Sequence, residues 1–281
     1  MRITSVLRIA PRDCWVQVAY ARRVIAGLTH DEILHEAIVR PLSARVPFPG
    51  QRIVDRPGWF QLLTPAFRDG GLNEVARVNL ADHEADAVID ALLAEYAADG
   101  IRFKWVVSPS CRPLDLARRL ASRGMLARRC VVMAADLADL RPEPSPEVSV
   151  ERVDFANVDT YAATVARGWG MPAGPLADYQ RAVLADTSGR HHSWLARIDG
   201  EPVGGANHAV FERSAYLMGG VILPEARGRG AYRSLIAARL AQISATGVRL
   251  VTIQAIAETS APILARLGFT TIAELDVFHN R

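Results

Sequence analysis

The stretch of sequence that decides the fold is residues 223–232, which reads LPEARGRGAY. It follows an apolar strand predicted over residues 214–223. It leads into a predicted helix whose apolar residues recur with a 3.6-residue period, namely Tyr232, Leu235, Ile236, Leu240 and Ile243. Gly228 and Gly230 let the backbone turn tightly, so that several N–H groups can point into one concavity at the positive end of the helix. With the cations Arg227, Arg229 and Arg233, the pattern favours a pyrophosphate-binding loop.

The spacing of this loop differs from that of two common phosphate-binding motifs. Three residues after Gly230 stands Arg233, where the dinucleotide fingerprint has a glycine. The sequence Gly-Lys-Ser/Thr of a Walker loop does not occur. On these residues alone, an ordinary strand-to-helix turn rich in arginine remains the alternative.

The segments around the loop alternate between strand and helix patterns. Besides the strand and helix already named, the C-terminal half predicts strands over 148–153, 193–198, 203–210, 249–256 and 269–278, and helices over 158–168, 176–184 and 260–267. Asp199-Gly200 predicts a hairpin, and Gly268 ends the last helix. The predicted class is a mixed α+β fold.

Two motifs in this order resemble the GNAT family of N-acetyltransferases. The first is Pro224-x-x-Arg227-Gly228-Arg229-Gly230 before a helix, and the second is Ala261-x-x-Leu264-x-x-Leu267-Gly268-Phe269. Arg227-x-x-Gly230 fits the start of the family's acetyl-CoA motif, Gln/Arg-x-x-Gly-x-Gly/Ala, whereas Tyr232 occupies its final Gly/Ala position. The resemblance covers residues 148–281. It implies an enzyme that transfers an acetyl group from acetyl-CoA to a primary amine by direct attack in a ternary complex.

The resemblance also implies how acetyl-CoA binds as a co-substrate, without a metal. Pantetheine pairs with the backbone of residues 220–223, the diphosphate lies on amides of residues 229–234, and an N–H near Val221 stabilises the oxyanion. The implied cofactor-binding residues are Val221, Ile222, Leu223, Arg227, Gly228, Arg229, Gly230, Ala231, Tyr232, Arg233 and Ser234.

The acid and the base are less well defined by the resemblance. Many members of the family carry a tyrosine as general acid at the position of Leu264, which cannot donate a proton. The candidates that we retain as catalytic are Glu212, Tyr216 and Ser260, and others with possible acid or base roles are His208, Glu258 and Tyr232. Each also has a plainer interpretation as a packing or surface residue. A non-catalytic acyl-CoA-binding or interaction protein of the same fold is therefore the alternative function.

The proline-rich segment 141–147, RPEPSPE, predicts a linker between residues 1–140 and 148–281. The N-terminal half repeats part of the pattern, with strands over 71–80, 102–108 and within 125–137, and helices over 81–98 and 113–123. Residues 79–83, NLADH, contain no glycine and add negative charge, which would repel a pyrophosphate. We therefore expect two acetyltransferase-like lobes, each with a central, mostly antiparallel sheet flanked by helices, the N-terminal one degenerate and without a cofactor loop. Residues 13–45 are predicted to be largely helical.

Composition narrows the remaining classes. Half of the 281 residues are hydrophobic, which is enough for a sizeable core, and no apolar run approaches the roughly 18 residues that span a membrane. Of 33 basic residues only Lys104 is a lysine, and acidic residues are interspersed, so a nucleic-acid partner is not expected. Cys14, Cys111 and Cys130 are too widely spaced for a disulfide framework or a zinc cluster. We expect a cytoplasmic monomer or homodimer that acts on a small-molecule or peptide amine.

Overall fold

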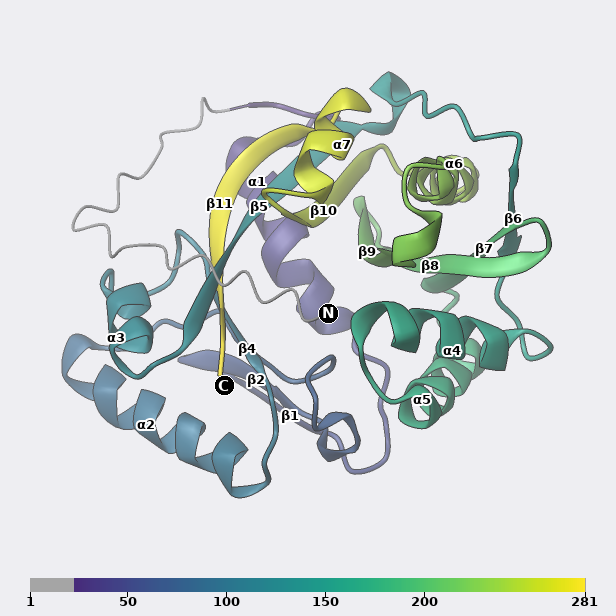
Figure 1. Cartoon of the computed structure of the whole chain (residues 1–281). Helices are drawn as coiled ribbons and strands as arrows, with labels where there is room; N and C mark the ends of the chain where they lie inside the picture. Colours follow the sequence, from purple (N-terminus) through teal and green to yellow (C-terminus); the bar gives the residue numbers. More distant parts are fainter. Residues whose placement is uncertain (1–22, 281) are drawn as a thin grey trace.

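The computed structural model describes residues 23–280, whose strands form one continuous mixed sheet (Figure 1). The strand order is β1-β2-β3-β4-β11-β5-β10-β9-β8-β7-β6. The strands are β1 (Arg52–Arg56), β2 (Trp59–Leu63), β3 (Glu74–Ala76), β4 (Lys104–Val107), β5 (Leu126–Asp136), β6 (Val148–Arg152), β7 (His191–Ile198), β8 (Glu201–Val210), β9 (Ser214–Ile222), β10 (Leu250–Ile256) and β11 (Thr270–His279). Neighbouring strands run antiparallel except in the pairs β3–β4 and β9–β10. The mixed α/β class is confirmed.

Helices cover both faces of this sheet. Figure 1 shows α6 on one face of β7–β9 and α4 and α5 on the other. The helices are α1 (His30–Leu34), continued by a π turn η1 (His35–Val39) and a 3₁₀ turn η2 (Arg40–Ala44), then α2 (Asp82–Ala98), α3 (Leu116–Ser122), α4 (Val158–Trp169), α5 (Ala173–Ala185), α6 (Ala231–Ser244) and α7 (Ser260–Arg266). Short 3₁₀ turns are η3 (Pro65–Phe67), η4 (Leu137–Asp139) and η5 (Pro224–Ala226).

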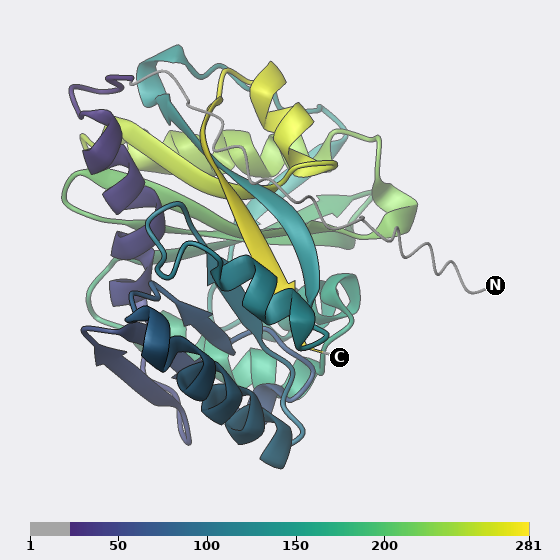
Figure 2. The same ribbon diagram turned by 90° about the vertical axis from the view of Figure 1, so that its left-hand side faces the viewer.

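The two halves of the chain exchange their last strands. β5, from the N-terminal half, pairs with β10, and β11, from the C-terminal half, pairs with β4. β5 and β11 also pair with each other, and both cross the middle of the molecule (Figure 2). Each parallel pair is therefore bordered by a strand of the other half: β11 lies beside β4, and β5 lies beside β10. Read from either edge, the sheet shows nearly the same arrangement of strands.

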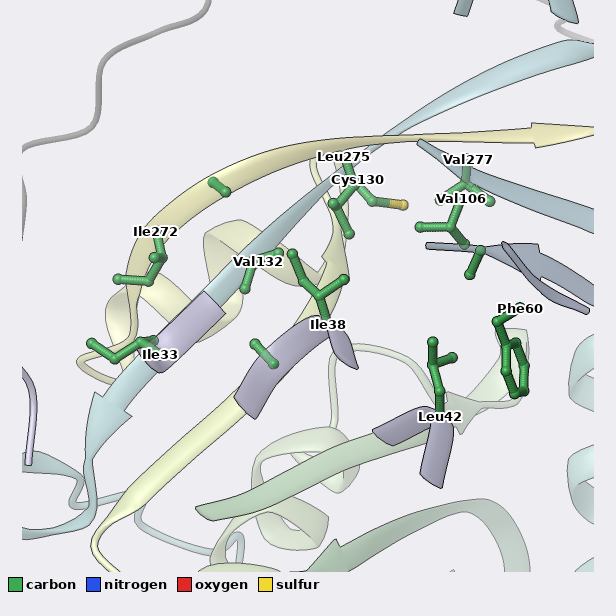
Figure 3. Close-up of a cluster of buried hydrophobic side chains, with 14 of the residues drawn as sticks. Ile33, Ile38, Leu42, Phe60, Val106, Cys130, Val132, Ile272, Leu275 and Val277 are labelled. Atoms are coloured by element: carbon green, nitrogen blue, oxygen red, sulfur yellow. The ribbon is translucent and has the colours of Figure 1, made fainter. Parts of the chain in front are cut away.

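A buried cluster along this seam contains side chains from both halves (Figure 3). Ile33, Ile38 and Leu42 of the α1–η2 segment face Val132 of β5 and Leu275 of β11, and all five are at most 9% exposed. Each such side chain contributes roughly 1.5–3 kcal/mol of burial free energy. The seam is therefore a part of the core, and the sheet passes through it without interruption.

Most predicted elements agree with the structure within a few residues, and the exceptions lie in the N-terminal half. The strand expected over 71–80 is reduced to β3, because Arg77 adopts a left-handed conformation (φ 53°) that ends the extended segment. The hairpin of β1 and β2 was not predicted. Of the helical region expected over 13–45, residues 30–44 are helical, while residues 13–22 and Cys14 lie outside the described part of the chain.

Candidate active site

The predicted phosphate loop joins β9 to α6 through η5. Gly230 precedes the helix with φ +85°, and a Cβ there would come within 2.7 Å of Ser145 Cβ. The N–H of Ser234 donates to the carbonyl of Gly230 and closes the first turn of the helix. The amides of Ala231, Tyr232 and Arg233 therefore lack a helical acceptor and are available to an anion.

The charges around this loop are unequal. Arg229 is held by two carboxylates, Glu147 at 3.2 Å and Asp199 at 3.4 Å. Arg227 donates from Nε to the carbonyl of Ile222 at 3.3 Å. Within residues 23–280, Arg227 and Arg233 form no ion pair, and both are exposed. These two arginines, more than Arg229, carry uncompensated positive charge at the loop.

A cleft of about 1340 Å³ begins at the loop and continues between β9 and β10. The two strands pair from Ser214–Leu250 to Leu217–Ile253, and beyond these residues they diverge. Side chains of α7 close one side of the cleft. Nine predicted cofactor-binding residues line it, namely Val221, Ile222, Arg227, Gly228, Arg229, Gly230, Ala231, Tyr232 and Arg233. Leu223 and Ser234 do not line it and are almost fully buried.

A bulge in β9 lies inside this cleft. Gly219 and Gly220 both face Ala206, because the register shifts between the pairs Gly205–Val221 and Asn207–Met218. Gly219 has φ +63°. Such a bulge leaves one residue without its ladder partner and turns its backbone toward the neighbouring space. The amide expected near Val221 is therefore better placed in the bulge, since Val221 itself is paired with Gly205.

Arg239 of α6 also lines the cleft and was not predicted. Its side chain is fully buried and donates to the carbonyls of Leu235 (3.0 Å) and Asn207 (3.1 Å). In the described part of the chain, its Nη2 has no hydrogen-bond partner. Burial lowers the pKa of Arg239 to about 10, so the guanidinium still carries its charge at neutral pH. A buried cation with a free donor therefore borders the space between β9 and β10.

The three catalytic candidates lie in three different places. Ser260 lines the cleft at the start of α7, where its Oγ accepts from the N–H of Ile256 at 3.0 Å. Tyr216 borders a second, smaller cavity, and burial raises the pKa of its hydroxyl, which stays protonated. Glu212 lies in the exposed turn between β8 and β9 and lines neither space. The structure thus does not bring these three residues together.

Two other residues considered at the sequence level are structural. His208 is fully buried, its Nδ1 accepts from the indole N–H of Trp194, and its Nε2 lies 2.6 Å from Gln242 Oε1. Leu264 is fully buried in the core beneath α7, whereas Ile263 and Leu267 line the cleft. The position where the GNAT family often carries a tyrosine therefore lies in the apolar core of this chain.

The second cavity measures about 140 Å³ and shares Met218 and Gln254 with the cleft. It is bordered by both halves of the chain. The N-terminal half supplies three charged residues, namely Arg45, Glu74 and Lys104. The carboxylate of Glu74, on β3, lies 2.7 Å from Arg45 Nη2 and 3.2 Å from Lys104 Nζ. Burial alone would raise the pKa of Glu74, but the charges of Lys104 and Arg45 outweigh it and hold that pKa below its ordinary value.

Sequence reasoning missed this charged group. A signal existed, because Glu74 and Lys104 each interrupt an apolar segment, NEVA and FKWVV, where a strand was predicted. Their pairing depends on the register of β3 and β4, which places them directly opposite one another. His191 and His192 begin β7, and both border the cavity.

Comparison with known proteins agrees with this geometry. Residues 175–280 match the family model described as an acetyltransferase (GNAT) domain. We therefore identify this part of the chain as a GNAT domain, as the resemblance implied. A comparison with curated proteins found no match.

Solved structures resemble a larger part of the chain. A GCN5-related N-acetyltransferase from Kribbella flavida has a TM-score of 0.59 and 18% identity over 89% of this chain and 95% of that one. A conserved protein of unknown function from Staphylococcus epidermidis has a TM-score of 0.61 and 13% identity over 85% and 96%. A tandem GNAT protein from the clavulanic acid biosynthesis pathway has a TM-score of 0.54 and 16% identity over 85% and 86%. At these identities the likeness concerns the fold.

Residues 23–280 contain no group of three or more His, Cys, Asp or Glu side chains arranged to hold a metal ion. None of their helices combines the length and the apolar character that crossing a membrane requires.

Proposed function

We propose that this protein transfers an acetyl group from acetyl-CoA to the nitrogen of a primary amine. The observation that carries the proposal is the junction of two spaces at Met218 and Gln254. The long cleft runs from an anion-binding loop to this junction, and the small cavity reaches it from the other side. A cofactor in the cleft and an amine in the cavity would meet there.

The groups lining the cleft suit the parts of coenzyme A. The free amides of residues 231–233, with Arg227 and Arg233, would hold the diphosphate. Pantetheine would lie between the diverging strands β9 and β10. The bulge at Gly219 and Gly220 would donate an N–H to the thioester oxygen, where negative charge develops during attack.

In the proposed reaction, the amine attacks the thioester directly. The nitrogen lone pair forms a C–N bond with the carbonyl carbon, and the C–S bond then breaks as coenzyme A leaves as a thiolate. The nitrogen loses one proton and the thiolate gains one, so that the products are the acetamide and the free thiol. Catalysis requires a neutral amine at the start and a proton for the sulfur at the end.

Three side chains could move these protons. Burial lowers the pKa of His191, which borders the cavity, so its imidazole is neutral at pH 7 and can accept the proton of the amine. The hydroxyl of Tyr216 is on the cavity side, and the hydroxyl of Ser260 is on the cleft side. We keep Ser260 as the candidate donor to the sulfur and Tyr216 as a donor in the cavity. Because Glu212 lies outside both spaces, no catalytic role is proposed for it.

The domain organisation is part of the proposal. We propose that residues 1–140 form a degenerate acetyltransferase-like lobe, that residues 141–147 form the linker, and that residues 148–281 bind acetyl-CoA. The support is the repeated order of a parallel strand pair with an intervening helix: β3, α2, β4 in one half and β9, α6, β10 in the other. The helix α2 begins after Ala81 and carries Asp82 and Glu84 in its first turn, which would oppose a phosphate.

The test begins with coenzyme A binding. Gly228→Asp adds a negative charge to the loop without a steric contact, since nothing lies within 4 Å of a Cβ at that position. Gly247→Asp is the matched control, because Gly247 has a similar φ (+78° against +82°), an equally open surrounding and no place in the cleft. We expect Gly228→Asp to weaken binding about tenfold or more, since charges near a protein surface interact by about 1–4 kcal/mol at close range. Equal affinity of the two variants would refute the assignment of the loop.

Acetyl transfer is then measured as thiol release with a panel of amines. Release above the rate without an amine supports an enzyme. Binding of acetyl-CoA without release for any amine would favour the alternative, a non-catalytic acyl-CoA-binding or interaction protein. That alternative is favoured by one observation, the burial of Leu264 at the position of the family's general acid.

A further inference from the structure

The small cavity has an unusual charge composition for its depth. Glu74 is 6% exposed, and it is shared by two cations, Arg45 and Lys104. The side chain of Arg45 is only 19% exposed, and in residues 23–280 its Nε is buried without a hydrogen-bond partner. A buried donor without a partner costs free energy unless a ligand satisfies it. The group is therefore incomplete in the protein alone.

The charges bordering the cavity do not cancel. One carboxylate and two cations leave an excess of one positive charge. His191 and His192 do not change this balance at neutral pH, because burial lowers the pKa of both imidazoles. Tyr179 and Tyr216, the remaining titratable groups on the cavity wall, stay protonated because burial raises the pKa of both hydroxyls. A ligand with one negative charge would neutralise the cavity.

The size of the cavity limits the ligand further. A volume of about 140 Å³ is close to that of an engineered cavity of about 150 Å³ that holds a benzene molecule. Tyr216 and Met218 point to the same side of β9, with their Cα atoms roughly 7 Å apart by strand geometry. A chain of a few bonds can therefore reach from the charged group, beside Tyr216, to the junction at Met218.

We propose that the acceptor is a small amino acid, whose carboxylate binds Lys104 and Arg45 while its amine reaches the thioester at the junction of cavity and cleft. This inference rests on the proposed function. Under it, the N-terminal half selects the acceptor and the C-terminal half binds the cofactor. A diamine would fit poorly, because its second ammonium group would lie against the cations Arg45 and Lys104. Glu74, the one carboxylate at this place, is already paired with both of them.

The first experiment compares acceptors that differ only in the carboxylate. Acetylation of β-alanine and 4-aminobutyrate is compared with acetylation of propylamine and butylamine, in which a methyl group replaces the carboxylate. The diamine 1,3-diaminopropane is measured as well. The common α-amino acids complete the panel. We expect kcat/KM to be highest for an amino acid and lowest for the diamine. If the enzyme binds acetyl-CoA and acetylates amines or diamines better than every amino acid, this inference is overturned, while the acetyltransferase proposal stands.

The second experiment changes the cation. Lys104→Met removes the charge at similar length, and Lys104→Arg keeps it. In Lys104→Met, we expect the preference for the amino acid over its matched amine to fall about 10- to 100-fold, which corresponds to the loss of a hydrogen bond to a charged group. In Lys104→Arg, we expect the preference to be largely retained. Acetyl-CoA affinity and Tm are measured on both, so that a folding defect is recognised. An unchanged preference in a folded Lys104→Met contradicts the inference.

A third measurement does not depend on turnover. Because Lys104 is the sole lysine of the chain, reductive methylation modifies only Lys104 and the N-terminal amine, and mass spectrometry resolves the two sites. N-acetyl-4-aminobutyrate, the expected type of product, should slow the methylation of Lys104, whereas N-butylacetamide should not. Equal rates with both ligands would count against a carboxylate site at Lys104, even if no acceptor is found. Failure of acetyl-CoA binding, by contrast, would refute the proposed function.

Discussion

The ring of Tyr232 lies against the bare backbone of Gly220: a methyl group on Gly220 would come within 3.1 Å of Tyr232 Cε2. Tyr232 stands where the acetyl-CoA motif of the GNAT family has glycine or alanine, and the sequence alone would place its side chain near the phosphates. In the structure the ring packs against β9 instead. The missing Cβ of Gly220 makes room for the ring, so the amides of the loop stay accessible.

This relationship predicts that substitutions at the two positions are coupled. Gly220→Ala adds a methyl group at this 3.1 Å contact, so the ring must shift by a few tenths of an ångström toward the cleft, and we expect coenzyme A binding to weaken several-fold. In a Tyr232→Ala background the same change should cost little, because the ring is gone. Calorimetric titration of the four proteins completes a double-mutant cycle. Additive effects would show that the ring and the glycine act independently.

Arg239 gives a prediction about the pantetheine part of the cofactor. Its unpartnered Nη2 borders the space between β9 and β10, where it can donate to a carbonyl oxygen of pantetheine. We expect Arg239→Met to weaken coenzyme A binding by about 1.5–3 kcal/mol, the range for hydrogen bonds from charged groups. Adenosine 3′,5′-bisphosphate lacks pantetheine and should bind the variant as it binds the original protein. A parallel loss for both ligands would indicate a general distortion of the cleft.

The C-terminal half was predictable from the sequence to within a few residues, because its strands and helices have clear periods and are separated by Gly, Pro and Asp-Gly signals. The loop at Gly228 and Gly230 was predictable for the same reason. The exchange of β5 and β11 was not. Both are long apolar strands after a short helix and a glycine, so their local sequences agree equally well with pairing inside a half or across the two halves.

The acceptor side was harder for a related reason. Arg45, Glu74 and Lys104 are separated by up to 59 residues in the sequence (104 − 45), and they meet only through sheet register and the position of η2. A charged residue inside an apolar strand indicates a partner without identifying it. The position of Tyr232 likewise depends on Gly220 of the preceding strand, which the motif itself does not contain.

The buried His208 predicts how stability depends on pH. Burial lowers its pKa in the folded protein to about 3, against 6.5 for a free imidazole. Between these values the unfolded chain binds a proton that the folded protein does not, so stability falls as the pH falls, by about 1.4 kcal/mol per pH unit from this group. The contribution is fully present above pH 6.5 and decreases below it.

Urea denaturation between pH 7 and pH 4.5 measures this slope. His208→Asn should flatten it, although the variant is expected to be less stable at pH 7, since the contacts with Trp194 and Gln242 are changed. His83→Asn is the control for the substitution itself, because His83 is exposed on α2, away from the buried contacts of His208. The same slope in His208→Asn as in the original protein would mean that His208 is not the group that titrates.

The strand exchange predicts that the two halves unfold together. Val131 and Met133 of β5 are buried among C-terminal side chains such as Ile236 and Leu264, and β10 has β5 as its neighbour on one edge. A fragment of residues 148–281 would lose these side chains from its core and expose an unpaired strand edge, so we expect it to aggregate or to lack fixed tertiary packing.

In the whole chain, tryptophan fluorescence can follow each half separately. Trp105 is buried in the N-terminal half and Trp194 lies on β7 in the C-terminal half. Variants that retain only one of them should show coincident urea transitions, since neither half has a complete core without a strand of the other. Transitions at clearly different urea concentrations, or a soluble 148–281 fragment with a cooperative transition of its own, would mean that the exchanged strands contribute little. The N-terminal half would then be a separable module, and its charged residues could be removed without unfolding the half that carries the phosphate loop.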